Sequence, residues 1–145
     1  MFLASKADEA FAKPILETLK EFGVNVDTVI LSAHKVPEKV LEKVRELNGR
    51  KEPTVLITVV GMSNGLSGII AGSSVHPVIA CPHCKDREDY LINIHSTLQM
   101  PSEVPVLTIL NPKNVALAAV RILAAADLKL RKKVEERIAK VKENY

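Results

Sequence analysis

Four short apolar runs, each followed by a turn and a segment with helical periodicity, restrict this chain to a small set of folds. The runs cover Val26–Leu31, Thr54–Val60, Pro77–Ala80 and Val104–Leu110. They are rich in β-branched residues and continuously apolar, as strands of a parallel sheet are when helices cover both of its faces. Strands and helices that alternate in this way predict a doubly wound α/β sheet with three layers, α/β/α.

The residues around these runs predict the remaining elements. Met1–Ala4 predicts an abbreviated first strand, and Asp8 is a suitable N-cap for a helix that Pro14 is expected to bend. The expected helices are Glu9–Phe22, Pro37–Gly49, Gly65–Ala71, Asn114–Ala126 and Leu128–Lys142. The charged cluster Asp86–Asp89 is expected to be an exposed loop.

Length and charge narrow the class of protein. The chain has 145 residues, which predicts one domain over 1–145 with a C-terminal helical extension from about residue 128. Its net charge of +3 comes largely from that extension, where lysines and arginines alternate with glutamates as on a solvated helix face. No aromatic-rich basic patch or zinc-finger spacing supports nucleic-acid binding. No stretch approaches the roughly 20 apolar residues of a membrane helix, and the N-terminus lacks a signal-peptide pattern, so we expect a cytoplasmic protein.

The segments that follow the strands are expected to carry the chemistry, because open parallel sheets bind ligands at the carboxyl ends of their strands. These segments are Ser5–Asp8, Ser32–Pro37, Gly61–Gly68, Cys81–Cys84 and Asn111–Asn114. Small, hydroxyl and amide side chains dominate them. The loop after the third strand leads into a helix whose first amides are able to bind a phosphate, although a tight strand-to-helix turn has the same pattern.

His34 is the candidate for proton transfer. It follows the second strand, near Ser32 and the cation Lys35. An imidazole is suited to general acid and base chemistry near neutral pH. A histidine that only hydrogen-bonds to the following helix fits the same spacing, so position alone leaves both interpretations open.

Three segments, taken in order and spacing, resemble the PurE family of aminoimidazole ribonucleotide (AIR) carboxylases and mutases. They are Ser32–Pro37, Gly61–Gly68 and His95–Pro101, and Val104–Leu123 extends the likeness to nearly the whole chain. The resemblance implies a flavodoxin-like domain in a homo-oligomer, an octamer in this family, with active sites built from neighbouring subunits. It also implies a cofactor-free enzyme of de novo purine biosynthesis that uses neither ATP, biotin nor a metal.

The loop after the third strand resembles the carboxylase branch of that family. Ser63-Asn64-Gly65-Leu66-Ser67 follows the carboxylase pattern, which has glycine or alanine at position 65. Mutases have a histidine at that position, and they usually have arginine at the position of Lys35. The implied reaction is the reversible addition of CO2 to AIR, which gives carboxyaminoimidazole ribonucleotide (CAIR). A mutase acting on the N-carboxylated isomer is the alternative enzyme. A flavodoxin-like nucleotide-binding module is the alternative without catalysis.

The resemblance also implies roles for individual residues. His34 would be the general acid and base, Asp8 would hold the ribose hydroxyls, and the loop would orient CO2. The implied substrate-binding residues are Ser5, Asp8, Ser32, Lys35, Gly61, Ser63, Asn64 and Gly65. The chain departs from the family at Ala4, Ala7 and Met62, where a glycine, a serine and an arginine are expected. We therefore expect the phosphate to depend more on Lys35, Lys6 and the loop amides.

The segment Cys81-Pro-His-Cys84 has the pattern of a thioredoxin-like disulfide oxidase. It follows a late strand without the preceding aromatic residue of such motifs, so we expect a structural pair of cysteines. Metal binding by Cys81, His83, Cys84 and His95 is a minor alternative, because no second paired motif accompanies it.

Overall fold

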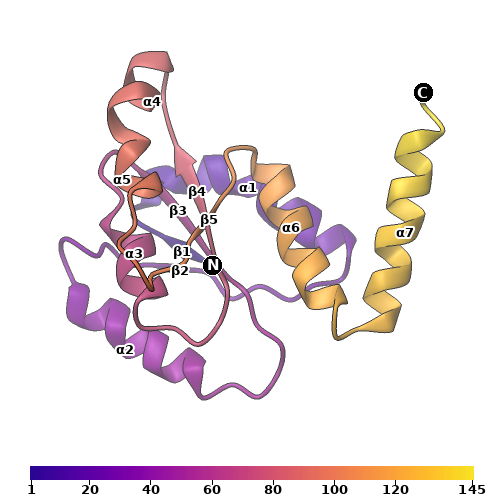
Figure 1. The fold of residues 1–145 in the computed structure, drawn as a ribbon, viewed down its shortest axis with the longest axis horizontal. Helices are drawn as coiled ribbons and strands as arrows, with labels where there is room; N and C mark the ends of the chain where they lie inside the picture. The colour runs from indigo at the N-terminus through magenta and orange to yellow at the C-terminus, as the bar shows by residue number, and fades with distance from the viewer.

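The computed structural model describes residues 1–145 and places a five-stranded parallel sheet between two layers of helices (Figure 1). The strands are β1 (Phe2–Leu3), β2 (Val29–Ile30), β3 (Leu56–Gly61), β4 (Val78–His83) and β5 (Leu107–Thr108). Their order is β2-β1-β3-β4-β5, and every neighbouring pair is parallel. This order, with helices on both faces, confirms the predicted flavodoxin-like fold.

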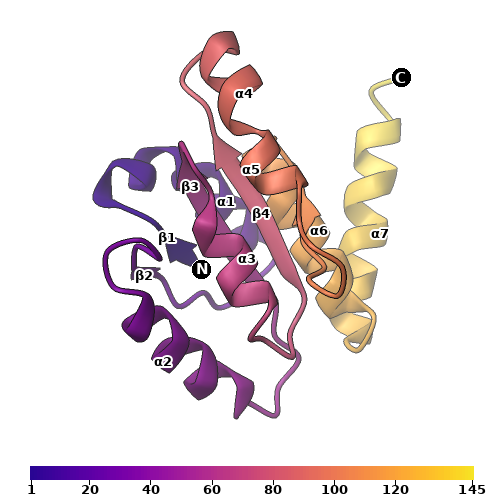
Figure 2. The same cartoon turned by 60° about the vertical axis from the view of Figure 1, so that its left-hand side comes forward.

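Helices cover both faces of the sheet, and each face has its own apolar core. They are η1 (Lys6–Asp8), α1 (Glu9–Glu21), α2 (Pro37–Asn48), α3 (Gly65–Ala71), α4 (Arg87–Asn93), α5 (His95–Leu98), α6 (Pro112–Ala124) and α7 (Leu128–Lys142). Figure 2 shows α3 in front of the sheet and α1 and α6 behind it. Successive strand residues point to opposite faces. Leu3 therefore packs in the core under α1 and α6, whereas Phe2 packs in the core under α2 and α3.

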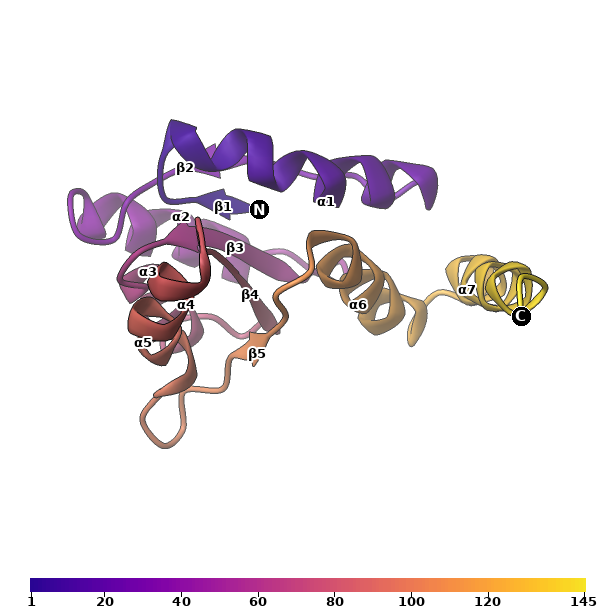
Figure 3. The same cartoon turned by 90° about the horizontal axis from the view of Figure 1, so that it is seen from above.

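The C-terminal helix α7 has the predicted bounds and stands away from the sheet (Figure 3). The Lys133 Nζ donates a hydrogen bond of 2.8 Å to the carbonyl of Phe22, at the end of α1. Arg137 pairs with Glu21 and lies over the Phe22 ring. Among the residues of α7 only Leu130 is buried, so most of this helix is free to meet another surface.

The structure corrects one predicted loop. The charged cluster Asp86–Asp89 is the N-cap and first turn of α4, in which Asp86 Oδ1 accepts a hydrogen bond of 2.9 Å from the Asp89 amide. Acidic side chains at a helix N-terminus satisfy free amides and complement the helix dipole, which explains the helix. The first helix runs through Pro14 to Glu21 without interruption. No helix of the chain is both long and apolar enough to cross a membrane.

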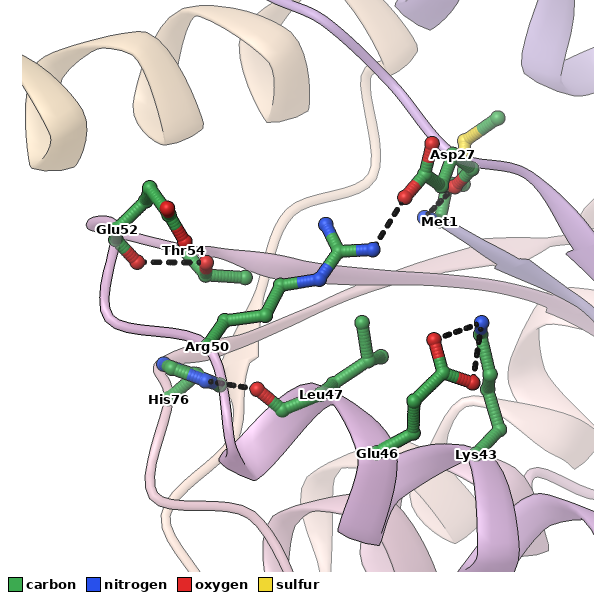
Figure 4. Close-up of polar contacts among 9 residues, drawn as sticks. All are labelled: Met1, Asp27, Lys43, Glu46, Leu47, Arg50, Glu52, Thr54 and His76. Carbon is green, nitrogen blue, oxygen red and sulfur yellow. Dashed lines mark hydrogen bonds and ion pairs between the residues drawn. The ribbon is translucent and has the colours of Figure 1, made fainter.

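A groove of about 450 Å³ opens at the amino-terminal ends of the strands, where the two-residue β1 lies beside the longer β3. The Met1 amine lines this groove and donates a hydrogen bond of 2.5 Å to the Asp27 carbonyl (Figure 4). Arg50 pairs with the Asp27 carboxylate at 2.5 Å and holds the pKa of that carboxyl below its ordinary value. Burial lowers the pKa of the Met1 amine from 8.0 to about 6, although Asp27 opposes the change.

In a chain that begins at Met1, the buried amine predicts a pH-dependent stability. Between pH 6 and pH 8 the unfolded chain holds a proton that the folded chain has released, so the free energy of unfolding rises with pH across this window. Each pKa unit corresponds to about 1.4 kcal/mol, so the full rise approaches about 3 kcal/mol. Urea denaturation at the two ends of the window measures it, with the amine-acetylated protein as control. Equal pH profiles for the two proteins would contradict the burial of the amine.

Candidate functional site

A cavity of about 510 Å³ opens at the carboxyl edge of the sheet, formed by the segments that follow β1, β2, β3 and β4 and by α4. It brings together seven of the nine residues predicted for the site. They are Ser5, Asp8, Ser32, His34, Lys35, Gly61 and Ser63. Asn64 and Gly65 are not among the lining residues. The four strands end at one edge because they are parallel, which is why segments far apart in sequence meet there.

Asp8 is buried at the end of η1, between Ser5 and His83. Its Oδ2 accepts hydrogen bonds from the Ser5 amide at 2.8 Å and from the Ser5 hydroxyl at 3.0 Å. Its Oδ1 faces the Nδ1 of His83 at 3.5 Å. Ser5 therefore fixes one carboxylate oxygen through a capping box, and the other oxygen accepts no hydrogen bond within the chain.

Asn64 is buried and holds the loop after β3 to α3 and α5. Its Oδ1 accepts a hydrogen bond of 3.1 Å from the Ser67 amide, which caps α3. Its Nδ2 donates to the Thr97 hydroxyl at 3.0 Å, and its own amide donates to the Ser96 hydroxyl at 2.9 Å. The side-chain amide is thus occupied by the protein, and the loop is anchored to α5.

His34 lies directly above the first residue of α3. An ideal Cβ placed on Gly65 would lie 2.8 Å from His34 Nε2 and 3.2 Å from its Cε1. Real Cβ atoms do not approach this closely, so the imidazole occupies the space that a side chain at position 65 would take. The glycine therefore has a steric role: it admits the His34 ring over the loop.

The three departures from the family pattern, Ala4, Ala7 and Met62, all lie in the cavity wall. Met62 has a φ of 57°, in the left-handed region that a non-glycine residue rarely adopts, and its side chain is 70% exposed. Backbone strain of this kind is typical of functional loops. The cations in the wall are Lys35 and Lys85.

Four polar residues of the cavity wall are not among the substrate-binding residues predicted from the sequence, namely His83, Lys85, Asp89 and Asn93. His83 is the last residue of β4, and the rule that ligands bind at the carboxyl ends of strands points to it. Asp89 and Asn93 come from α4, whose first turn the sequence predicts to be an exposed loop. The Lys85 amide and the Asn93 side chain donate to Asp89 and lower the pKa of its carboxyl.

The two cysteines are free thiols near this edge of the sheet. Burial raises the pKa of the Cys81 thiol to about 12. The pKa of Cys84 is also raised, by burial and by the nearby Asp89 and Asp86. No three His, Cys, Asp or Glu side chains converge as metal ligands.

Comparisons with known proteins agree on one family. A family model described as AIR carboxylase matches residues 1–144. A phosphoribosylaminoimidazole carboxylase from Archaeoglobus fulgidus is 40% identical over 134 residues, which are 92% of this chain and 73% of that protein. An N5-carboxyaminoimidazole ribonucleotide mutase from Methanocaldococcus jannaschii is 35% identical over 144 residues, 98% of this chain and 88% of that protein.

A solved structure gives the same result at the level of the fold. The crystal structure of Treponema denticola PurE matches with a TM-score of 0.92 at 34% identity, over 99% of this chain and 90% of that one. Relatives with further domains also exist: the chain spans 29% of a multifunctional protein from Caenorhabditis elegans.

The raised thiol pKa values predict that neither cysteine is a redox centre. Because only the thiolate attacks, we expect iodoacetamide at neutral pH to label Cys81 more than about a hundredfold more slowly than free cysteine. Cys84, which is half-exposed, is expected to react faster than Cys81 but more slowly than free cysteine. Mass spectrometry of the folded and the urea-unfolded protein measures both rates. Rapid labelling of Cys81, or a Cys81–Cys84 disulfide after mild oxidation, would restore the redox hypothesis.

Proposed function

The chain belongs to the AIR carboxylase (PurE) family of purine biosynthesis, and from this premise we propose that it is a carboxylase that adds CO2 directly to AIR. The observation that carries the proposal is the position of His34 above Gly65. Mutases of the resembled family place a histidine at position 65. In this chain position 65 is a glycine, and His34 is the imidazole that lies over it, which supports the carboxylase rather than the mutase reaction.

The proposed reaction needs one proton acceptor. The exocyclic amine of AIR makes the adjacent ring carbon an enamine-like nucleophile, so this carbon forms the new bond to CO2 with its own electron pair. The same carbon must then lose its hydrogen to restore the aromatic ring. We assign His34 as the base that takes this proton and, in reverse, returns it. The step requires neither ATP nor biotin, because CO2 is already the electrophile.

The surrounding residues divide into groups with different tasks. We assign Asp8 to the ribose hydroxyls, since its Oδ1 accepts no hydrogen bond from the protein. Ser5, Ser32 and Lys35 are assigned to the phosphate and ring, with Lys85 as a second cation at the rim. Ser63 and the loop amides are assigned to CO2 and the growing carboxylate. Asn64 acts indirectly, by holding the loop in place.

We also propose that the chain works as a cytoplasmic homo-oligomer, an octamer as in the resembled family. Exposed apolar side chains support an assembly, among them Leu91 and Ile92 on α4, Leu98 on α5 and Leu128 on α7. α7 has a single buried residue, so it is suited to packing against a neighbouring subunit.

The assignment of His34 predicts the effect of one substitution. His34→Asn removes the base and keeps most of the shape of the site, so turnover should fall by about a hundred- to ten-thousandfold. Binding of AIR, measured by calorimetry, should stay within about an order of magnitude. A variant that keeps near-wild-type turnover would remove His34 from the mechanism.

The choice of substrate tests the reaction itself. We expect the protein to form CAIR from AIR and bicarbonate, at a rate that rises with dissolved CO2, because a carboxylase must admit CO2 from solution. Added ATP or a metal chelator should leave the rate unchanged. The N-carboxylated isomer should be the poorer substrate. If that isomer reacts much faster than AIR with CO2, the protein is a mutase.

A further inference from the structure

His83 lines the cavity but has no role in the proposed reaction. It is the last residue of β4, paired in register with Gly61 of β3, so it lies at the same sheet edge as His34. Its side chain is only 28% exposed. Its ring is stacked on Phe11 of α1, with centroids 4.3 Å apart and planes inclined by 15°. The stacking and the strand fix the orientation of the imidazole.

The fixed imidazole faces the carboxylate that we assign to the ribose. Nδ1 of His83 lies 3.5 Å from Oδ1 of Asp8, whose side chain is only 6% exposed. Ser5 already holds the other oxygen of this carboxylate, through its amide and its hydroxyl. Asp8 is therefore held between two neighbours, one for each oxygen, and its rotation is restricted.

The 3.5 Å separation is longer than a good hydrogen bond. Nδ1 therefore faces the carboxylate without a hydrogen bond to it, which leaves acceptor capacity on Oδ1 for a ligand. A carboxylate accepts about four hydrogen bonds, and Asp8 uses two of them at Oδ2. Oδ1 thus faces His83 and is still open to donors from the cavity.

We propose that His83 is a positioning residue for the nucleotide: it orients Asp8 so that Oδ1 receives the hydroxyl groups of the ribose. The proposal rests on the proposed function, because that function supplies the ribonucleotide. His83 acts through Asp8 and does not touch the reacting carbon. Its loss should therefore weaken binding of AIR and leave the chemical step nearly unchanged.

Two substitutions separate the ring from its nitrogen. His83→Phe keeps an aromatic ring to stack on Phe11 and removes Nδ1, so we expect the KM for AIR to rise about tenfold with kcat within about twofold. His83→Asn places an amide near the position of Nδ1 and should recover most of the affinity. His76→Asn is the matched control. That histidine contacts the Leu47 carbonyl at 2.9 Å (Figure 4). It precedes β4, at the amino end of the strand, whereas the cavity lies at the carboxyl end, so its loss should leave KM unchanged.

A double-mutant cycle tests whether His83 acts through Asp8. In an Asp8→Asn background, His83→Phe should raise KM no further, because the carboxylate that it orients is gone. Calorimetric binding of AIR and the thermal melting temperature are recorded for every variant. A structural role alone would lower the melting temperature and kcat together and would show no rescue by His83→Asn.

The outcomes distinguish this proposal from the proposed function. If the wild type carboxylates AIR and His83→Phe leaves KM unchanged, or if its effect adds fully to that of Asp8→Asn, the role of His83 is overturned and the function stands. If the wild type binds AIR without converting it and His83→Phe weakens that binding, the function is overturned and the positioning role stands. If the wild type neither binds nor converts AIR, both are overturned.

Discussion

The imidazole of His34 lies so close to the first residue of α3 that a side chain at position 65 would displace it. The candidate site depends on this contact, since it places a proton acceptor over the loop between β3 and α3. His34 follows β2 and Gly65 follows β3, so the two partners are far apart in sequence. They meet because β2 and β3 both flank β1 and run parallel to it, so the segments after them leave the sheet at the same edge.

A buried polar network keeps the loop in place beneath the imidazole. Thr58 of β3 and Ser67 of α3 share a hydrogen bond of 2.7 Å, and Asn64 links Ser67 to Thr97 of α5. No buried side-chain nitrogen or oxygen in the chain lacks a hydrogen-bond partner. A fully satisfied network in a low-dielectric interior is rigid, which suits a loop that has to orient a small substrate. The short helix α5 thus has a defined task, to supply Ser96 and Thr97 to this loop.

The sequence predicted the parts of this arrangement that follow from local pattern. Continuous apolar runs identified the buried strands, and their carboxyl ends identified His34 and most of the cavity wall. Three features were beyond such patterns. Asn64 has the same local sequence whether or not it caps a helix, and its contacts with Ser67 and Thr97 become visible only in the fold. The cluster at Asp86–Asp89 is polar enough for a loop, yet its acidic side chains cap α4. His83 lies within a Cys-x-x-Cys pattern, which points to redox or metal chemistry. Its contacts with Asp8 and Phe11, which suggest a positioning role, are seen only in the fold.

The most direct test of this account is the turnover of Gly65→Val with AIR and CO2. The Cβ of the new side chain would lie 2.8 Å from Nε2 of His34, and its two methyl groups would extend into the space of the ring and push the ring from its place. A displacement of about 1 Å is enough to cost about a hundredfold in rate, so we predict a loss of that size in kcat with AIR binding nearly unchanged. Gly68→Val is the matched control, because its side chain would meet the flexible Met100 side chain at 3.3 Å. A Gly65→Val protein as active as the Gly68→Val protein would contradict the proposed placement of His34.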